Sequence, residues 1–401
     1  MNQAAQDVFE VMDGQRKKAV IRVIGVGGGG CNTVNQMASA GIEGVEFIVA
    51  NTDRDHLERC IPTNQLQLGA AITRGLGAGS DPAVGRQAAE EDRDRIREMI
   101  EGTDLLFITA GMGGGTGTGA TPVIAQIAKE AGVLTVAVVT KPFGHENKKR
   151  MKVALKGIEE LRQFTDSLVL IPNEKLGLVL GSKVTVLNCF KAANDVLQNA
   201  VQGISELITR PGLINVDFAD VKTVMSNRGM AMMGIGTASG EGRAQKAVEM
   251  ALSSPLLDDI ELHGAQGLLV NVTSDDSLTM EELEFVNCHV NNIASDEADV
   301  KCGMSVNPNL NGELRVTVVA TGLVGSRQQA LAAAAQQNPK VTQFIKPEIP
   351  LPTRQAEIEK PAFAREQQPR MVAAGGGRGV QFPEISEEIL NIPAFLRHQA
   401  D

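Results

Sequence analysis

The sequence predicts an α/β protein with a Rossmann-like parallel sheet, a long central helix, a second, smaller α/β domain and a disordered C-terminal linker. Three observations lead to this prediction. Short apolar runs alternate with segments of helical spacing, glycine-rich loops follow or neighbour several of those runs, and one helical pattern extends over residues 188–209. The length of 401 residues is sufficient for two packed domains.

The first half of the chain should form the parallel sheet. Buried parallel strands are apolar on both faces, and five short runs have this character: residues 20–26, 45–50, 104–109, 133–139 and 167–171. Helical spacing occurs between them, for example over 85–102 and 122–131. This alternation is typical of βαβ units. We assign it to a domain over residues 20–187, after a flexible extension over 1–19.

A long central helix is expected over 188–210, ended by Pro211 and Gly212, because proline cannot continue a helix. A second α/β domain should then occupy 211–325. Its predicted elements are a helix over 217–227, a strand over 230–238, a helix over 243–252, a strand over 268–273, a helix over 280–293 and strands over 300–306 and 314–321. The segment NPNLNGE (307–313) resembles a hairpin turn between the last two strands.

The character of the chain changes after Gly325. Residues 326–383 contain 7 Pro, 9 Gln and 10 Ala without apolar periodicity, which indicates a disordered linker. Residues 384–401 are apolar again, as is typical of a tethered peptide that binds a partner protein. Four acidic residues against Arg397 give this peptide a net charge of −3, which disfavours adsorption to anionic lipid. We therefore expect a protein adaptor and no direct membrane insertion.

Composition argues against several functional classes. The net charge of −10 and the lack of Trp and Tyr disfavour a general nucleic-acid binder, which uses basic patches and aromatic stacking. The five cysteines show no CxxC spacing and the five histidines no HExxH, so neither a disulfide framework nor a zinc site is indicated. The N-terminus lacks the apolar region of a secretory signal. These features favour a soluble protein of a reducing compartment.

Glycine is concentrated in three loops. Residues 25–30 (GVGGGG), 75–79 (GLGAG) and 111–119 (GMGGGTGTG) together hold 14 of the 42 glycines. A glycine loop that leads from a strand into a helix can present free N–H groups to an anion. A single such loop could be only a tight turn, whereas three at the same edge of a sheet favour phosphate binding.

The loops alone leave the phosphate ligand open. The GxGxxG pattern within 25–30, with Asp53 near the place of a ribose-binding acid, matches a dinucleotide site. However, such a site does not need a second glycine array as dense as 111–119. No lysine follows the arrays as in a P-loop. The phosphates should therefore be held by backbone amides and by the hydroxyls of Thr116 and Thr118.

The segment GGGTGTG (113–119) is the signature of the tubulin superfamily, which this chain resembles. Further segments carry the same resemblance: GVGGGGCN (25–32), NTD (51–53), GLGAG (75–79), KPFGHENKKR (141–150), AANDVL (192–197) and NVDFADV (215–221). Within the superfamily the chain is similar to the bacterial tubulin-like cell-division GTPases. The similarity covers about residues 20–325 and returns at EILNIPAFLRHQAD in the C-terminal peptide.

The resemblance implies a GTP-binding domain, the central helix and a second domain that contacts the next subunit of a filament. The nucleotide-binding residues that it implies are Gly28, Gly29, Gly30, Cys31 and Asn32, with Thr116, Gly117 and Thr118 at the phosphates, Glu146 and Arg150 at the ribose, and Asn173 and Asp195 at the guanine. The implied ligands are GTP or GDP with Mg²⁺, and no residue is assigned to the metal. A carboxylate can accept hydrogen bonds from guanine N1–H and N2–H together, which adenine does not offer.

The resemblance also implies that Asp217 and Asp220 are catalytic and orient water at the γ-phosphate of the neighbouring subunit. The protein would then be a GTPase that polymerises head to tail, is activated by its own polymerisation and forms the ring scaffold at the bacterial division site. That ring would lie in the cytoplasm, on the inner face of the membrane. The implied partners are further copies of the chain and, through 384–401, membrane-anchor and regulatory division proteins.

Plainer interpretations exist for several of these residues. Glu146 and Arg150 are spaced i,i+4 and could form a surface helix pair. Asp217 and Asp220 could be the N-cap and a first-turn acid of a helix. Cys31, which stands where the family usually has a small residue, could be oxidation-sensitive or a buried inert thiol.

Two other functional classes also remain open. An NAD-dependent oxidoreductase would need a catalytic residue such as His263 or His289, and a scaffold could bind nucleotide without hydrolysing it. His145 and Asn147 are atypical within their motif and could alter nucleotide affinity.

Overall fold

The computed structural model describes residues 19–180, 185–209, 216–227, 229–254, 257, 265–295 and 297–323. The predicted linker over 326–383 and the peptide over 384–401 lie outside the described residues, as does nearly all of the predicted N-terminal extension. Pro211 and Gly212, predicted to end the central helix, also lie outside them.

The first half of the chain forms the predicted parallel sheet, with the strand order β3-β2-β1-β4-β5-β6. The strands are β1 (Ile21–Val26), β2 (Val45–Asn51), β3 (Asn64–Gln67), β4 (Leu105–Gly111), β5 (Leu134–Lys141) and β6 (Ser167–Pro172). The five predicted strands are confirmed. The additional strand β3 has the polar sequence NQLQ, which gives no apolar signal.

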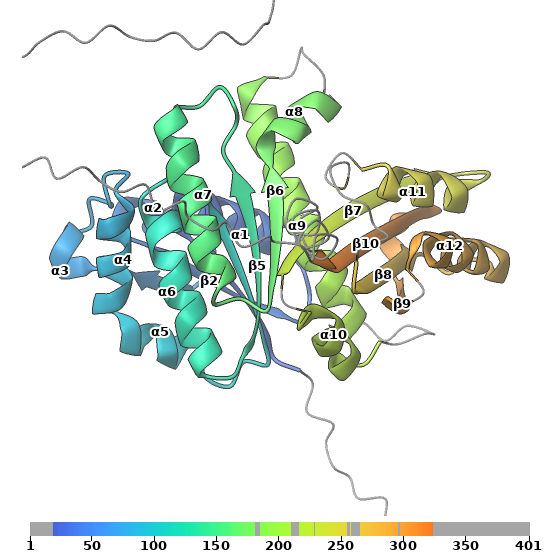
Figure 1. Cartoon of the computed structure of the whole chain (residues 1–401), viewed down its shortest axis with the longest axis horizontal. Coiled ribbons are helices and arrows are strands. Elements are labelled where there is room, and N and C mark those ends of the chain that lie inside the picture. The colour runs from blue at the N-terminus through green and yellow to red at the C-terminus, as the bar shows by residue number, and fades with distance from the viewer. Residues whose placement is uncertain are drawn as a thin grey trace, which may run out of the picture. The chain divides into compact units, whose positions relative to one another are not determined.

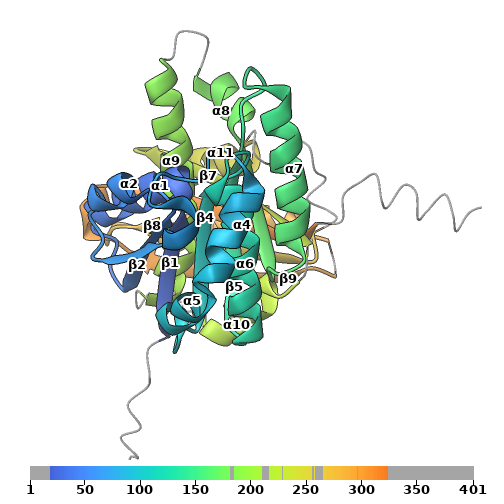
Figure 2. The same cartoon turned by 90° about the vertical axis from the view of Figure 1, so that its left-hand side faces the viewer.

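Helices cover both faces of this sheet (Figures 1 and 2). They are α1 (Gly27–Ser39), α2 (Arg54–Glu58), α3 (Ala70–Thr73), α4 (Pro82–Glu91), α5 (Arg93–Ile100), α6 (Thr116–Glu130), α7 (Lys148–Arg162) and α8 (Asn173–Leu180). Alternate residues of β4 enter different cores. Leu105 and Phe107 pack with α1, whereas Leu106 and Ile108 pack with α4 to α7. This two-sided burial explains why the strands are apolar throughout.

Two predicted helices differ from the structure. The segment 85–102 is two helices, α4 and α5, that meet at Asp92, whose carboxylate accepts a hydrogen bond from the Gly69 backbone N–H (2.7 Å). The helix expected over 122–131 already begins at Thr116. Glycine at the start of α6 allows α4 and α6 to pack closely, since a Cβ on Gly119 would lie 2.0 Å from the Pro82 carbonyl oxygen.

The predicted central helix is confirmed as α9 (Val186–Thr209). Its buried side chains contribute to the same core as β1, β4 and β5. The helix runs from the edge of the sheet near α8 towards α10 (Phe218–Met225), and both views place α8 and α10 at opposite ends of the molecule (Figures 1 and 2).

The second half continues the same sheet, in the order β6-β7-β10-β8-β9. Its elements after α10 are β7 (Gly229–Ser239), α11 (Arg243–Leu252), β8 (Gly267–Ser274), α12 (Met280–Ile293), β9 (Asp299–Val306), a 3-10 turn (Pro308–Leu310) and β10 (Glu313–Leu323). The junction β6–β7 is parallel, and β10 is antiparallel to both of its neighbours. The helices α11 and α12 cover a separate core.

The predicted hairpin at NPNLNGE is wrong. The strands β9 and β10 that it connects are not paired, because β8 lies between them. The connection crosses the end of β8, where the Asn307 N–H donates to the Ser274 carbonyl oxygen (2.8 Å). The N–H of Gly312, the residue before β10, donates a hydrogen bond to Asp275 Oδ2 (2.6 Å).

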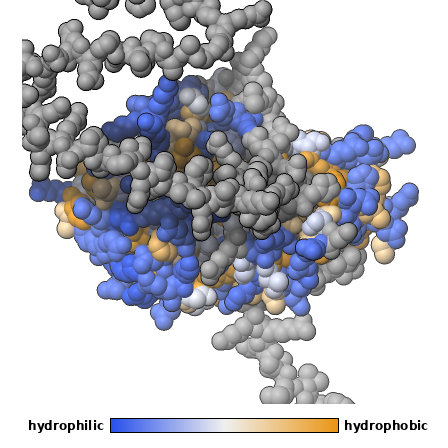
Figure 3. All heavy atoms as spheres, in the orientation of Figure 1, coloured by the Kyte–Doolittle hydropathy of each residue, from blue (hydrophilic) through white to orange (hydrophobic). Residues whose placement is uncertain are grey.

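No helix within the described residues is long and apolar enough to span a membrane. The face shown in Figure 3 is mostly hydrophilic, with apolar residues scattered over it. The most exposed large apolar side chains of the described residues are Leu76, Leu187 and Met280.

Candidate functional site

A cavity of about 280 Å³ lies at the carboxyl ends of the parallel strands. Ligands of open α/β sheets bind at this edge. Its wall includes the last residues of β1 and β4, the penultimate residue of β5 and the residue after β6, with α9 on one side. The lining residues are Val26, Gly28, Gly29, Thr33, Gly111, Met112, Gly114, Gly115, Thr116, Gly117, Thr140, Pro142, Glu146, Arg150, Asn173, Phe190, Ala193, Asn194 and Leu197.

Two of the three glycine loops border this cavity. Gly28 and Gly29 belong to the first turn of α1, and Gly117 belongs to the first turn of α6. The N–H groups of a first helical turn have no partner within the helix and can bind an anion. The loops are in close contact, because a Cβ on Gly27, which has φ +69°, would lie 2.8 Å from the Gly117 nitrogen.

The third loop, 75–79, packs against neighbouring segments outside the cavity. None of its residues lines the cavity. The Gly75 carbonyl oxygen accepts a hydrogen bond from the Arg54 N–H (3.0 Å), and a Cβ on Gly115 would lie 2.9 Å from the Ala78 Cβ. Asp53, considered as a ribose-binding acid, instead accepts a hydrogen bond from the His56 N–H (3.0 Å) as the N-cap of α2.

The two threonines predicted at the phosphates have different surroundings. Thr116 lines the cavity, and its hydroxyl lies 2.6 Å from the hydroxyl of Thr52. The Thr118 hydroxyl accepts a hydrogen bond from the Gly113 N–H (2.8 Å), and Thr118 does not line the cavity. Thr118 therefore stabilises the loop, and Thr116 is the threonine whose position suits a ligand.

Glu146 and Arg150 both line the cavity and form an ion pair (3.0 Å). Glu146 Oε1 also accepts a hydrogen bond from the Phe143 N–H (2.9 Å). Glu146 and Arg150 therefore form the i,i+4 pair of the plainer interpretation and also border the candidate ligand site. The neighbouring Asn147 is the N-cap of α7, and His145 stacks on Phe143 with 5.2 Å between ring centroids.

Of the two residues predicted at the guanine, only one lines the cavity. Asn173 lines the cavity, is 6% exposed, and its Oδ1 has no hydrogen-bond partner among the described residues. A buried amide oxygen without a partner is costly, so a ligand N–H here would satisfy it. Asp195 accepts a hydrogen bond from Gln36 Nε2 and does not line the cavity.

Sequence reasoning missed the α9 residues that do line the cavity. Phe190, Ala193, Asn194 and Leu197 follow the i, i+3, i+4, i+7 spacing of one helix face. This spacing could have shown from the sequence that Asn194 lies on the same helix face as the three apolar residues. The Asn194 Oδ1 accepts a hydrogen bond from the Thr33 hydroxyl (3.0 Å), which fixes α9 against α1.

Three residues of the first glycine motif lie outside the cavity lining. Gly30 is buried where a Cβ would lie 2.3 Å from the Thr109 carbonyl oxygen, and Asn32 is exposed. The Cys31 thiol is fully buried and lies 3.6 Å from the Gly25 carbonyl oxygen. Burial, with a smaller contribution from Cys60, raises the pKa of Cys31 above its ordinary value, which favours the inert thiol. Nucleotide contacts by these three residues, Thr118 and Asp195 stay predictions.

The two predicted catalytic acids lie far from the cavity within one chain. Asp217 occupies the N-cap position of α10, but its exposed side chain makes no capping hydrogen bond. Asp220 lies in the first turn of α10 and forms an ion pair with Lys301 (3.2 Å). Ala193 lines the cavity, and the α9 segment from Ala193 to Thr209 alone spans about 24 Å at 1.5 Å per residue.

The described part of the chain contains no cluster of three or more His, Cys, Asp or Glu side chains that could hold a metal ion. The cavity lining supplies backbone groups, hydroxyls, amides and a single ion pair. Such a donor set suits an anionic ligand that brings its own metal through phosphate oxygens and water.

Comparisons with known proteins find relatives over most of the chain. The model of the Tubulin/FtsZ family GTPase domain matches residues 20–181, and that of the FtsZ family C-terminal domain matches residues 229–324. The chain is 54% identical to the cell division protein FtsZ of Coxiella burnetii over 97% of this chain and 99% of that protein. The corresponding protein of Pseudomonas putida is 49% identical over 98% and 100%. The solved structure "FtsZ dimer, empty" from M. jannaschii has a TM-score of 0.74 at 48% identity, covering 77% of this chain and 89% of that chain.

Proposed function

The chain belongs to the Tubulin/FtsZ family, and from this premise we propose that it is a cell-division GTPase whose hydrolytic site is completed between subunits. GTP would occupy the cavity at the ends of β1, β4, β5 and β6. Subunits would stack head to tail, so that Asp217 and Asp220 of one subunit meet the nucleotide of the next. Such a contact is heterologous and open, and therefore produces filaments.

A single observation supports the shared site best: the cavity borders the N-terminal half of α9, whereas Asp217 and Asp220 follow its C-terminal end. Among the described lining residues the only carboxylate is Glu146, and it is engaged by Arg150 and the Phe143 N–H. Asp217 is exposed without a capping bond. An N-cap acid that does not cap its helix is available for another role, here the orientation of the attacking water.

The proposed preference for guanine rests on Asn173 and Asp195. The Asn173 amide oxygen lines the cavity without a partner and could accept from a base N–H. The Asp195 carboxylate lies on α9 beside Gln36, next to the lining residue Asn194. Guanine offers two neighbouring N–H groups on one edge. Mg²⁺ would be held mainly through phosphate oxygens and water, where it would neutralise charge on the transferred phosphoryl group.

Phosphate release measured with GTP and with ATP, at several protein concentrations, tests this proposal. A shared site requires that turnover per subunit increases steeply with protein concentration, and that GTP is preferred. Turnover per subunit that is independent of concentration would place the whole site in one chain. Equal phosphate release with both nucleotides would remove the guanine assignment. If no phosphate is released although a separate titration shows that GTP binds, a scaffold is favoured.

We further propose that the filaments form the division ring in the cytoplasm, on the inner face of the membrane, with residues 384–401 docked in a groove of adaptor or regulatory proteins. The apolar residues of this peptide, including Ile389, Leu390 and Phe395, are suited to such a groove. Deletion of 384–401 should leave GTP turnover and filaments in solution unchanged but detach the filaments from the membrane in cells. Membrane-attached rings of the truncated chain alone would contradict this role.

A further inference from the structure

A lysine on the edge strand β9 lies beside one of the two proposed catalytic carboxylates. Lys301 Nζ is 3.2 Å from Asp220 Oδ1 and 3.3 Å from Asp299 Oδ1. Asp220 is in the first turn of α10, so this contact joins α10 to the edge of the sheet. The Lys301 side chain is 32% exposed and that of Asp220 42%. The pair is therefore accessible to a second molecule.

The strand itself directs Lys301 towards α10. Val300 and Cys302 pack against the core of α11 and α12. Because successive residues of a strand point to opposite faces, Lys301 lies on the other face together with Asp299. The residue paired with Lys301 in β8 is Leu269, which belongs to the core that contains α9 and α10 side chains. Asp299 thus contacts the Lys301 ammonium group from β9, while Asp220 contacts it from α10.

We propose that Lys301 is a positioning residue for GTP hydrolysis, which holds the Asp220 carboxylate in the orientation that it needs at the nucleotide of the next subunit. This inference rests on the proposed function, because Asp220 meets a nucleotide only between subunits. The hydrogen bond to Asp220, followed by that to Asp299, raises the pKa of Lys301 above its ordinary value, so both contacts favour the charged ammonium group.

The competing explanation for this side chain is protection of the sheet edge. A lysine on an edge strand can deter pairing with the sheet of another molecule. That role requires a charge at the edge but no carboxylate partner on α10. It predicts no change in turnover within assembled filaments, so the two roles differ in what they do to kcat.

The test compares Lys301→Met, Lys301→Arg and the control Lys222→Met for GTP turnover per assembled subunit and for the critical concentration of assembly. Lys222 is an exposed lysine of α10 without an ion pair to the described residues. We expect Lys301→Met to lower kcat about three- to tenfold, as a misdirected catalytic group does, with a critical concentration within about twofold of the unaltered chain. Lys301→Arg should restore at least about half of the turnover, and Lys222→Met should change neither quantity.

Several results would overturn the inference. They are unchanged or increased turnover in Lys301→Met, a raised critical concentration with normal turnover at saturation, and an equal loss in Lys222→Met, which would reflect net charge alone. Asp299→Asn, which removes the second carboxylate around Lys301, should give a smaller loss than Lys301→Met and serves as a second variant.

Asp220→Asn separates this inference from the function on which it rests. If Asp220→Asn abolishes turnover but Lys301→Met does not, only the role of Lys301 is wrong. If Asp220→Asn retains turnover, the proposed shared site itself is wrong. If the shared site and the role of Lys301 are both correct, the double variant Asp220→Asn/Lys301→Met should be no slower than Asp220→Asn alone, because Lys301 acts through Asp220.

Discussion

The hydroxyl oxygens of Thr52 and Thr116 lie 2.6 Å apart in a buried hydrogen bond that joins the segment after β2 to the first residue of α6. Thr116 lines the cavity, whereas Thr52 is not among the lining residues. The Thr52 carbonyl oxygen also accepts a hydrogen bond from the Thr73 hydroxyl (3.3 Å). The geometry of the proposed phosphate site therefore depends on residues that a ligand does not touch.

Thr52→Val should weaken GTP binding about threefold to tenfold, since the loss of one buried hydrogen bond costs about 1 kcal/mol and leaves the Thr116 hydroxyl free to rotate. Equilibrium titration with GTP measures the effect. The matched control is Thr165→Val, which removes a buried hydroxyl that donates to the Leu161 carbonyl oxygen (3.3 Å), away from the cavity lining. An equal loss of affinity in both variants would contradict a specific role for Thr52.

Gly117→Ala and Gly114→Ala should behave differently although both glycines line the cavity. A Cβ at position 117 would lie 2.7 Å from the Gly111 carbonyl oxygen, whereas a Cβ at 114 would meet no atom within 4 Å. Overpacking of this kind costs about 1–3 kcal/mol. We expect Gly117→Ala to lower both the melting temperature and GTP affinity, the latter by about tenfold or more, while Gly114→Ala keeps the melting temperature. Equal melting temperatures in thermal denaturation would refute this distinction.

A mixture of Asp220→Ala and Gly117→Val chains should release more phosphate than either variant alone. The two methyl groups of valine add to the clash of the Cβ with the Gly111 carbonyl oxygen, so the Gly117→Val subunit should not bind nucleotide. In the mixture its intact acids meet the intact cavity of the Asp220→Ala subunit. Turnover is measured across mixing ratios, with co-assembly confirmed by co-sedimentation. The absence of recovery at every ratio, despite co-assembly, would count against a site shared between subunits.

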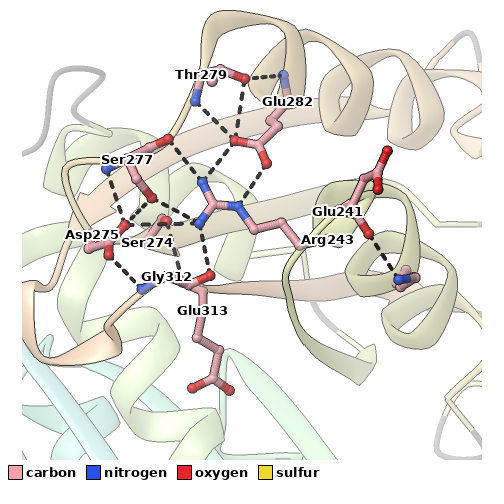
Figure 4. A network of polar contacts seen from close by, with 10 residues as sticks. Glu241, Arg243, Ser274, Asp275, Ser277, Thr279, Glu282, Gly312 and Glu313 are labelled. Carbon is pink, nitrogen blue, oxygen red and sulfur yellow. Dashed lines mark hydrogen bonds and ion pairs between the residues drawn. The ribbon is translucent and has the colours of Figure 1, made fainter.

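Arg243→Met should destabilise the second half of the chain by about 3 kcal/mol, as the removal of one partner of a buried ion pair does. The Arg243 side chain is 8% exposed and binds Glu282 through Nε (2.7 Å) and Nη2 (2.9 Å). It also donates to Ser277 and to the Gly312 carbonyl oxygen, and so joins α11, α12 and the start of β10 (Figure 4). Urea unfolding measures the loss.

The control for Arg243 is Arg54→Met, which breaks an exposed i,i+4 pair with Glu58. Exposed pairs contribute about 0.5 kcal/mol or less, so this variant should unfold almost like the unaltered chain. A comparable loss in both variants would show that the burial of Arg243 is unimportant.

The contribution of Glu282 to stability should disappear in acid. Its hydrogen bond with Arg243 lowers the pKa of Glu282 below the ordinary 4.5, although burial acts in the opposite direction. A carboxyl group whose pKa is lower in the folded state stabilises the fold above its unfolded pKa, and this stabilisation is lost as the pH falls through the folded value. The difference in melting temperature between the unaltered chain and Glu282→Gln should therefore shrink below about pH 4.5. A difference that grows in acid would contradict this assignment.

The buried parallel strands were predictable because burial on both faces leaves an unbroken apolar run. The long helix α9 was predictable because its apolar residues recur with helical spacing. Contacts between distant segments were not. The break at Asp92 depends on the backbone of Gly69, and the failed hairpin depends on β8, which reaches its place from 33 residues before the turn at Asn307.

The candidate site was predictable to a similar extent. The family resemblance implied Glu146, Arg150 and Asn173, which the structure brings to one cavity. Helical spacing groups Asn194 with Phe190, Ala193 and Leu197, but the motif AANDVL alone does not reveal whether the face of Asn194 or that of Asp195 borders the cavity. The direction of a side chain on α9 is decided by its packing against α1, where Asn194 meets Thr33.

Among the described residues, the two halves of the sheet meet at β6 and β7 through three residue pairs, from Ser167–Gly229 to Val169–Ala231. Each half also packs its outer helices around a core of its own. Substitutions can therefore accumulate in one half with little consequence for strand pairing in the other. The core around α9, in contrast, contains strand residues of both halves, among them Phe107 and Val319. A working hybrid of two relatives would therefore have to preserve this core together with the short seam.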